Sequence, residues 1–429
     1  MILEFSVKNF RSIKDLQTIS FVPTGLKSPD PITDSNNIVT FQNDVSVLKT
    51  VGIYGANASG KSNIIKAMNR FVEAIRYTSS QPNYIAQLCE PNIYNEDKSE
   101  GSFFQMMIFL NGKKYRYGFV TKKGSDYRPE NKDNLSSSPY VVESEWLYGT
   151  VEKNMKCLFL RKGIDVENNS LSSMKDPIPM RLPFAHTLFL SYAAAFDSQG
   201  IANEILSSFS QYYCNDNQGS SVFRFFSTTF VRQKNLKSDL LRLLSSFGLY
   251  YDDIDLTGNE EDDKKLDYPL DKIVMIKHLK MGGDVHLNLA NQESSGTQKL
   301  FDLMGILLFS FLRVTSQSVI SLDEIDDKFH PSLLIKLVSM FNDKKVNKGN
   351  AQLIFTSHDT NLLSPKIMRR DQFYFTEKQL DETTRLFSLA DLKGIRNDAD
   401  FAKQYLAGFY GASPILSKYS TMGESNDGK

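Results

Sequence analysis

The stretch Val51-Gly-Ile-Tyr-Gly-Ala-Asn-Ala-Ser-Gly-Lys-Ser-Asn63 decides the fold. From Gly55 to Ser62 it matches the pattern G-x-x-x-x-G-K-[ST] without a mismatch. Loops of this kind wrap backbone N–H groups around the phosphates of a nucleotide. An apolar, β-branched run at 47–53 precedes the loop, and apolar residues at helical spacing follow it over 63–75. This strand–loop–helix order predicts a nucleoside triphosphate site and disfavours a plain Gly/Ser-rich turn.

Each position of this phosphate loop has an expected role towards ATP. Lys61 brings a positive charge to the β- and γ-phosphates for binding and reaction, and the Ser62 hydroxyl is placed to ligate Mg²⁺. The expected nucleotide contacts are Gly55, Asn57, Ala58, Ser59, Gly60, Lys61, Ser62 and Asn63. Arg11, in a basic turn between two strand-like runs, is either a solvated turn residue or a further contact to phosphate or base.

Two later strands deliver candidate catalytic side chains. The apolar run 318–322 ends in Asp323 and Glu324, the arrangement called Walker B. Asp323 is expected to bind Mg²⁺ directly or through water, and Glu324 to polarise the attacking water. A further strand, 352–357, leads to His358, whose ring can donate a hydrogen bond to the γ-phosphate. Two acids at a strand end could be structural, but a phosphate loop in the same chain favours the catalytic interpretation.

Ser294, Ser295 and Gly296 come just before a long apolar helical stretch that runs to residue 312. Free N–H groups and the helix dipole favour an anion at such a position. Alone, Ser-Ser-Gly indicates only a capped helix start. Beside the other nucleotide motifs, these three residues become candidate contacts to ATP.

Composition limits the class of protein. The chain has 429 residues, 50 basic and 50 acidic side chains and a formal net charge of zero, so no global field indicates a nucleic-acid partner. DNA binding through a local patch stays open. The three cysteines are far apart and form no C-x-x-C pair, which fits a reducing compartment. No signal peptide and no run of 18 apolar residues is present, so we expect a cytoplasmic protein without a membrane partner.

The predicted fold is α/β, a P-loop NTPase of the ABC-ATPase head type. We expect a mixed central sheet with an antiparallel β lobe and a helical lobe. Asn111–Gly112 between two β-rich runs is a strong hairpin signal within the β lobe. The predicted parts are an N-terminal ATPase lobe at 1–190, a helical insertion at 191–275 and a C-terminal ATPase lobe at 276–429.

The order of motifs resembles the ABC-type ATPase heads, and several stretches narrow the resemblance. The chain looks like the AAA15-type, ABC-like ATPases related to RecF, SMC and OLD proteins, from about residue 1 to 416. These stretches are Asn9-Phe-Arg-Ser12, the loop 54–62, Tyr115-Arg-Tyr-Gly-Phe119, Glu293-Ser-Ser-Gly-Thr297, 323–331, 356–363, 370–372 and 405–414.

This resemblance implies ATP and Mg²⁺ as cofactors. It also implies a homodimer or higher homo-oligomer, in which Ser294–Gly296, the signature, closes over ATP held by the other subunit. Members are often encoded in anti-phage defence systems with a separate effector, commonly a nuclease; the ATPase subunits of Septu and PARIS are of broadly this kind. The expected function is an ATP-hydrolysing dimer switch that senses or controls such an effector.

Two departures from the family pattern concern single residues. The family often carries a Gln, the Q-loop residue that senses Mg²⁺, at the position of Ala195, and Gln199 is the nearest candidate here. The C-terminal motif usually has an Arg where this chain has Phe409.

Two other functions remain in competition. A RecF-like ATPase in DNA repair would bind duplex DNA itself and show a steep salt dependence. A transporter ATPase subunit is disfavoured, because the β-rich part and the C-terminal motif differ from those of transporter heads.

Overall fold

The computed structural model describes residues 1–41, 44–78, 81, 83–124, 139–151, 154–171, 178–196, 199–215, 221–263, 265, 267–312 and 317–412. Its centre is a six-stranded sheet in which the first five strands are parallel and the last is antiparallel. The strand order is β11 (Tyr212–Asn215), β15 (Val319–Leu322), β16 (Gln352–Thr356), β5 (Thr50–Gly55), β17 (Phe373–Lys378) and β18 (Thr384–Ser388).

The parallel strands are apolar because both faces of the sheet are covered. Every residue of β5, β15 and β16 is buried, as expected of parallel strands between two layers. The carboxyl ends of these three strands share one edge, where β5 ends at Gly55, Asp323 follows β15 and Ser357 follows β16. Open α/β sheets bind ligands at this edge.

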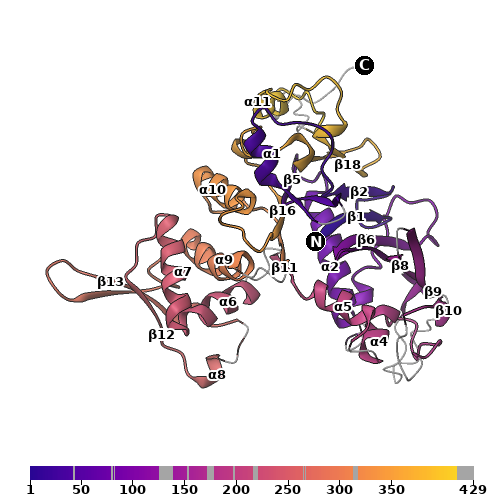
Figure 1. Ribbon diagram of the computed structural model, residues 1–429, viewed down its shortest axis with the longest axis horizontal. Helices are drawn as coiled ribbons and strands as arrows, with labels where there is room; N and C mark the ends of the chain where they lie inside the picture. Colours follow the sequence, from indigo (N-terminus) through magenta and orange to yellow (C-terminus); the bar gives the residue numbers. More distant parts are fainter. Residues whose placement is uncertain are drawn as a thin grey trace, which may run out of the picture.

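A seven-stranded antiparallel sheet forms the β lobe (Figure 1). Its order is β10 (Asp165–Asn169), β9 (Asn154–Lys162), β8 (Tyr140–Val151), β7 (Lys113–Lys123), β6 (Ser102–Leu110), β1 (Ile2–Lys8) and β2 (Gln17–Ser20). Asn111 and Gly112 have φ of 49° and 78°, so the predicted hairpin is confirmed.

Helix α2 (Lys61–Tyr77) joins the two sheets. It contacts β5, β15 and β16 in one sheet and β1 in the other. Phe71 stacks on Phe119 of the β lobe with ring centroids 5.1 Å apart. The helix that begins at the phosphate loop is therefore held in a core made by both sheets.

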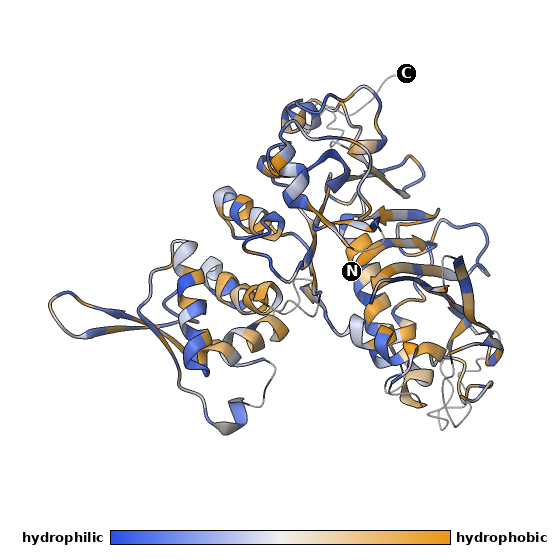
Figure 2. Cartoon of the chain, in the orientation of Figure 1, coloured by the Kyte–Doolittle hydropathy of each residue, from blue (hydrophilic) through white to orange (hydrophobic). Residues whose placement is uncertain are grey.

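The helical lobe stands apart from this core, at the left of Figure 1. It contains α6 (Ser221–Val231), α7 (Lys234–Ser246) and α9 (Ser295–Leu312), with β12 (Asp253–Leu256), β13 (Ile273–His278) and β14 (Asp284–Asn288). A Cβ at Gly305 of α9 would lie 2.2 Å from the Ser227 backbone nitrogen, so glycine allows α6 and α9 to touch. Figure 2 shows α9 largely hydrophobic, in agreement with its buried residues.

The helices of this lobe cover other residues than the helical insertion expected from the sequence. The prediction placed the helical insertion at 191–275, whereas α6, α7 and α9 span 221–312. Helices α4 (Phe189–Phe196) and α5 (Ile201–Phe209) pack on α2 instead, and β11 joins the central sheet. Apolar residues at helical spacing indicate a helix with a buried face, but they do not tell which layer covers it.

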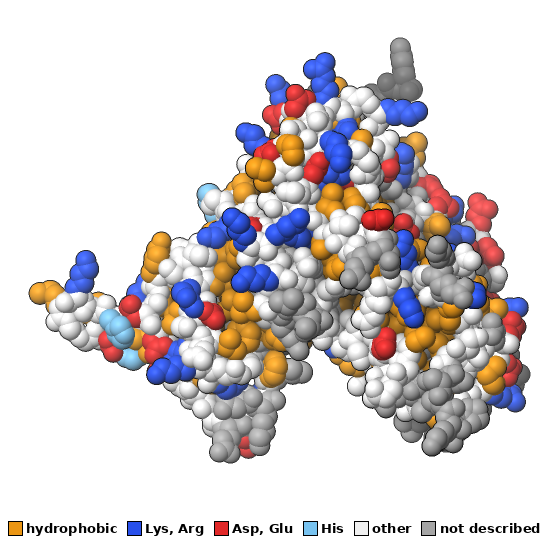
Figure 3. Space-filling model, viewed as in Figure 1, with side chains coloured by type: hydrophobic (Ala, Val, Ile, Leu, Met, Phe, Trp, Pro, Cys, Tyr) orange, Lys and Arg blue, Asp and Glu red, His pale blue; other side chains and the backbone are white. Residues whose placement is uncertain are grey.

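The remaining elements are α1 (Pro31–Asn37), β3 (Ile38–Thr40), β4 (Ser46–Leu48), α3 (Asn83–Ala86), α8 (Glu260–Asp263), α10 (Pro331–Asn342) and α11 (Phe401–Leu406). Among the described residues, no helix is both long and apolar enough to cross a membrane. Acidic and basic side chains both occur on the face shown in Figure 3.

Candidate nucleotide site

Two glycines shape the phosphate loop. Gly55 and Gly60 have φ of 151° and 103°, and a Cβ at either would collide with a neighbour. The collision would be with the Thr376 carbonyl oxygen at 2.4 Å for Gly55, and with the Thr384 hydroxyl oxygen at 2.0 Å for Gly60. Glycine is required at both positions, by backbone conformation and by space.

Lys61 is the first residue of α2 and lies against the loop. Its Nζ donates hydrogen bonds to the carbonyl oxygens of Gly55 at 2.9 Å and Ala56 at 3.1 Å. Burial lowers the pKa of Lys61, while the nearby carboxylates of Asp323, Asp326 and Glu324 oppose that shift. The loop's own carbonyls thus orient the charge expected to meet the phosphates.

Asp323 connects the phosphate loop to two strands. Its Oδ1 accepts hydrogen bonds from the Ser62 hydroxyl at 3.1 Å and the Thr356 hydroxyl at 2.6 Å. A serine hydroxyl beside a carboxylate is an oxygen donor set that suits Mg²⁺, which commonly takes one or two carboxylates and completes its shell with phosphate and water oxygens. In the described part of the chain no group of three or more His, Cys, Asp or Glu side chains could hold a metal.

A cavity of about 530 Å³ brings most of the phosphate loop together with Glu324 and His358. Glu324 has a φ of 49°, and its backbone N–H donates to the Thr356 hydroxyl at 2.7 Å. His358 is fixed through its backbone N–H, which donates to Asp326 Oδ2 at 3.1 Å. The residues around the cavity are Ser12, Asn57, Ala58, Ser59, Gly60, Lys61, Ser62, Asn63, Glu324 and His358.

Burial lowers the pKa of His358, and the charge of Lys61 lowers it further, while the surrounding acids oppose the shift. At neutral pH the imidazole is therefore uncharged, with one ring N–H to donate. An uncharged donor beside Lys61 can bind a phosphate oxygen without adding a second positive charge.

Arg11 does not line this cavity. Its Nε donates to Glu90 Oε2 at 2.5 Å, and one terminal nitrogen donates to Asn63 Oδ1 at 3.4 Å. Asn63 in turn donates to the Ser12 hydroxyl at 2.7 Å. Arg11 supports the wall of the site through Asn63, and its contact to phosphate or base stays a prediction.

The signature residues lie elsewhere in the same chain. Ser294 precedes α9 and caps it, because its hydroxyl accepts the Thr297 backbone N–H at 3.2 Å. Gly296 lies against the turn after Glu324, where a Cβ would be 2.9 Å from the Lys328 carbonyl oxygen. Ser294 and Ser295 are exposed, and none of Ser294–Gly296 borders the cavity at the phosphate loop.

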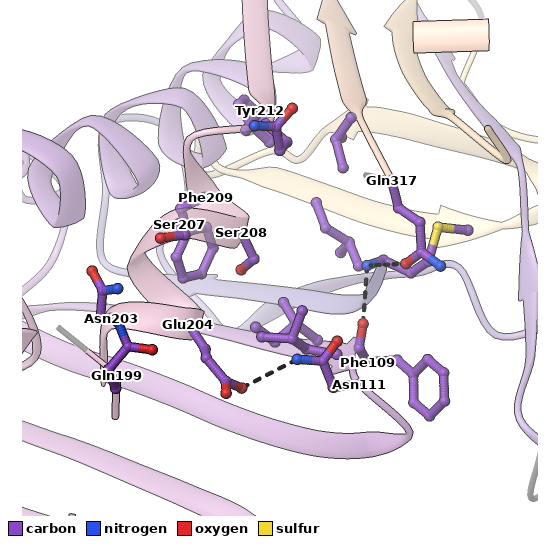
Figure 4. Close-up of a pocket in the computed structure, with 16 residues that line it drawn as sticks. Phe109, Asn111, Gln199, Asn203, Glu204, Ser207, Ser208, Phe209, Tyr212 and Gln317 are labelled. Carbon is purple, nitrogen blue, oxygen red and sulfur yellow. Dashed lines mark hydrogen bonds between the residues drawn. The ribbon is translucent and has the colours of Figure 1, made fainter. Parts of the chain in front are cut away.

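Gln199 is not brought to the predicted Mg²⁺ position. It lines a separate cavity of about 600 Å³ together with Tyr212 and Val319 (Figure 4). Tyr212 and Val319 are the first residues of β11 and β15, whereas Asp323 follows the other end of β15. Gln199 therefore belongs to the amino-terminal edge of the sheet, and the phosphate loop to the opposite edge.

Sequence reasoning missed several residues that hold the loop. Thr384 Oγ1 donates to the Ser59 carbonyl at 3.0 Å and is hydrogen-bonded to the Ser12 hydroxyl at 2.7 Å. The hydroxyls of Ser59 and Thr376 are 2.6 Å apart. Ser12 lies within the stretch Asn9-Phe-Arg-Ser12 that carries part of the family resemblance, but nothing in the sequence around Thr376 or Thr384 marks these two residues.

The site can now be compared with known proteins. One similar solved structure is the recombination mediator protein RecF-ATPrS of the RecFOR pathway, 14% identical, with a TM-score of 0.35 over 90% of this chain and 98% of that one. No curated protein sequence matches the chain. The family model described as "AAA domain, putative AbiEii toxin, Type IV TA system" matches residues 51–364. That match covers most of the chain and includes the phosphate loop, the Asp323–Glu324 pair and His358, so the protein belongs to this family of AAA-domain ATPases.

Proposed function

We propose that the protein binds and hydrolyses ATP with Mg²⁺ and acts as a nucleotide-driven dimer switch. The observation that carries the proposal is the single cavity that Lys61, Ser62, Glu324 and His358 share. The four side chains offer a charge for the phosphates, a metal ligand, a base and a neutral hydrogen-bond donor. This is the set that phosphoryl transfer to water requires.

Within this cavity each side chain has a distinct task. Glu324 accepts the proton of the attacking water, and His358 donates a hydrogen bond to the γ-phosphate. Bound Mg²⁺ would neutralise charge on the phosphates, held by Ser62 and Asp323. Lys61 balances the remaining charge as the bond to the γ-phosphate breaks.

The position of the signature supports the proposal of a dimer. Ser294–Gly296 offers N–H groups to an anion at the start of α9, yet it does not border the chain's own cavity. A second copy can supply its signature across a two-fold axis, which makes two equivalent sites. ATP would then favour the closed dimer through its higher affinity for that state.

The proposal that the switch controls an effector protein rests on the motif resemblance. The AAA15-type group acts with a separate effector, commonly a nuclease, in anti-phage defence. The family description names a toxin–antitoxin system, which supports a role alongside a second gene product. We therefore propose that nucleotide state controls a nuclease-class effector that binds the dimer, as in Septu and PARIS.

The experiment that tests the proposal compares the wild type with Glu324→Gln. The amide keeps the shape of the side chain but cannot accept the proton, so turnover should fall about 10²- to 10⁴-fold while ATP still binds. The variant should also accumulate as an ATP-bound dimer in sedimentation. Turnover within a few-fold of the wild type would refute the role of Glu324, and a wild type that binds no ATP would refute the function.

A further inference from the structure

The chain segment 405–412, here the C-terminal turn, reaches the phosphate loop from the far end of the sequence. The Ala412 carbonyl accepts the Ala56 backbone N–H at 3.1 Å. The Tyr405 hydroxyl oxygen, at the end of α11, accepts a hydrogen bond from the Gly55 backbone N–H. Burial raises the pKa of Tyr405, and this hydrogen bond only partly offsets the rise, so the hydroxyl is neutral at all physiological pH values.

Aromatic packing fixes the C-terminal turn on the central sheet. The Tyr405 ring stacks on Phe375 of β17 with centroids 5.5 Å apart, and the Tyr410 ring lies 5.2 Å from the same Phe375. Phe375 is paired with Tyr54 of β5, the residue before Gly55. The turn is therefore anchored on β17, the neighbour of the strand that leads into the phosphate loop.

One peptide unit links the C-terminal turn to Lys61. The Gly55 carbonyl and the Ala56 N–H belong to the same planar, trans peptide, so they point in opposite directions. The N–H donates to the Ala412 carbonyl on one side. The carbonyl accepts from Lys61 Nζ on the other side, at 2.9 Å. Rotation of this peptide would move the Gly55 carbonyl away from the Lys61 ammonium group.

We propose that the C-terminal turn is a positioning element for the phosphate loop, with Tyr405 as its positioning residue. Ala412 holds the Gly55–Ala56 peptide through the Ala56 N–H, and Tyr405 holds the preceding peptide through the Gly55 N–H. With both of its peptides held, the Gly55 carbonyl places the Lys61 ammonium group for the phosphates of ATP. The other half of the loop is held separately, by Thr376 and Thr384. This inference rests on the proposed function, because it assigns an effect on ATP to Lys61.

The test removes one hydroxyl and leaves the ring. Tyr405→Phe keeps the stacking on Phe375 and loses only the hydrogen bond to Gly55. The matched control is Tyr374→Phe, which loses a buried hydroxyl that accepts the Ser20 backbone N–H at 2.9 Å, outside the nucleotide cavity. We expect Tyr405→Phe to weaken ATP binding three- to tenfold and Tyr374→Phe to leave it unchanged.

Two further measurements separate positioning from general destabilisation. In a Lys61→Ala background, Tyr405→Phe should cause no further loss of ATP affinity, because the two residues act through one contact. Without nucleotide, Tyr405→Phe should speed amide hydrogen exchange in the phosphate loop, and Tyr374→Phe should not. The inference would be overturned if Tyr405→Phe changed neither the amide exchange of the phosphate loop nor the affinity for ATP. It would also be overturned if Tyr405→Phe lowered ATP affinity as much in the Lys61→Ala background as in the wild type. A wild type that binds no ATP would instead overturn the proposed function, and the exchange measurement would still test the positioning.

Discussion

At the scale of single residues, the site is built from side chains whose orientation is fixed before ATP arrives. Lys61 is held by two backbone carbonyls and Asp323 by two hydroxyls. Glu324 adopts a left-handed backbone conformation that non-glycine residues rarely take. Such a conformation persists only where its surroundings enforce it, and here the Thr356 hydroxyl accepts the Glu324 N–H.

Lys61→Ala should weaken ATP binding. The change removes the hydrogen bonds of a charged donor to the phosphates, which contribute about 1.5–3 kcal/mol. The dissociation constant should rise roughly ten- to a hundredfold. Equilibrium titration with ATP measures it, and an unchanged constant would contradict the phosphate-loop assignment.

His358 should make the folded state sensitive to acid. Its pKa is lowered in the folded protein, so the unfolded chain binds more protons below about pH 6.5 and stability falls as the pH falls. Replacing it by Gln should therefore flatten the loss of unfolding free energy between pH 7.5 and 5.5. Denaturant unfolding at several pH values measures this slope.

His278 provides a control of opposite sign. The carboxylate of Asp284 raises the pKa of His278 by hydrogen bonding and charge, so protonation of this histidine favours the folded state. His278→Gln should steepen the acid-dependent loss that His358→Gln flattens. If both variants showed the same slope of unfolding free energy against pH, the opposite pKa shifts assigned to His358 and His278 could not both be right.

At the scale of elements, the phosphate loop depends on strands that follow it in sequence by more than 300 residues. Ser59 contacts Thr376, 317 residues later, and Thr384, 325 residues later. Strands β17 and β18 extend the sheet beyond β5, and their residues Thr376 and Thr384 form a wall against the loop. The phosphate loop therefore lies against β17 and β18 on one side and continues directly into α2.

Gly60→Ala tests that wall. The new Cβ would lie 2.0 Å from the Thr384 hydroxyl oxygen, so the loop must move and ATP affinity should fall at least tenfold. Gly112→Ala is the matched control, because Gly112 also has a positive φ but no atom within 4 Å of its Cβ position. We expect Gly112→Ala to lower the melting temperature slightly and to leave ATP titrations unchanged. Normal affinity in Gly60→Ala would argue against the tight packing.

At the scale of the whole molecule, the helical lobe carries the signature and the central sheet carries the phosphate loop. Lys299, one turn into α9, donates to the Asp327 carbonyl at 3.0 Å, just after the Asp323–Glu324 pair. The signature therefore lies against the turn that follows Glu324 in its own chain, but it does not border the cavity at the phosphate loop. If a second copy completes the site, the signature of one subunit and the phosphate loop of the other would together join the two subunits.

A mixing experiment tests the shared site. Lys61→Ala and Ser294→Arg should each be inactive alone, but a heterodimer of the two keeps one composite site, from Lys61 of one chain and Ser294 of the other. Partial recovery of ATPase activity is expected on mixing. A chain carrying both changes, mixed with either single variant, should recover nothing. Heterodimers that form without any recovery would exclude the shared site.

The sequence by itself determined the chemistry that short patterns specify. The glycines and lysine of the loop, the Asp323–Glu324 pair, His358 and the Asn111–Gly112 hairpin all depend on local backbone geometry and side-chain type. The structure contains the hairpin, and Gly60, Lys61, Glu324 and His358 line one cavity. Each of these signals extends over a few residues, so no knowledge of the topology was needed.

Only the tertiary structure decided which distant residues meet. It placed Gln199 at the edge of the sheet opposite the phosphate loop, gathered α6, α7 and α9 in one helical lobe and brought Thr384 and Ala412 to the phosphate loop. These outcomes follow from strand order and from packing between layers. A threonine or an alanine has no local pattern that reveals its partner 300 residues away, because that contact exists only once the sheet has assembled.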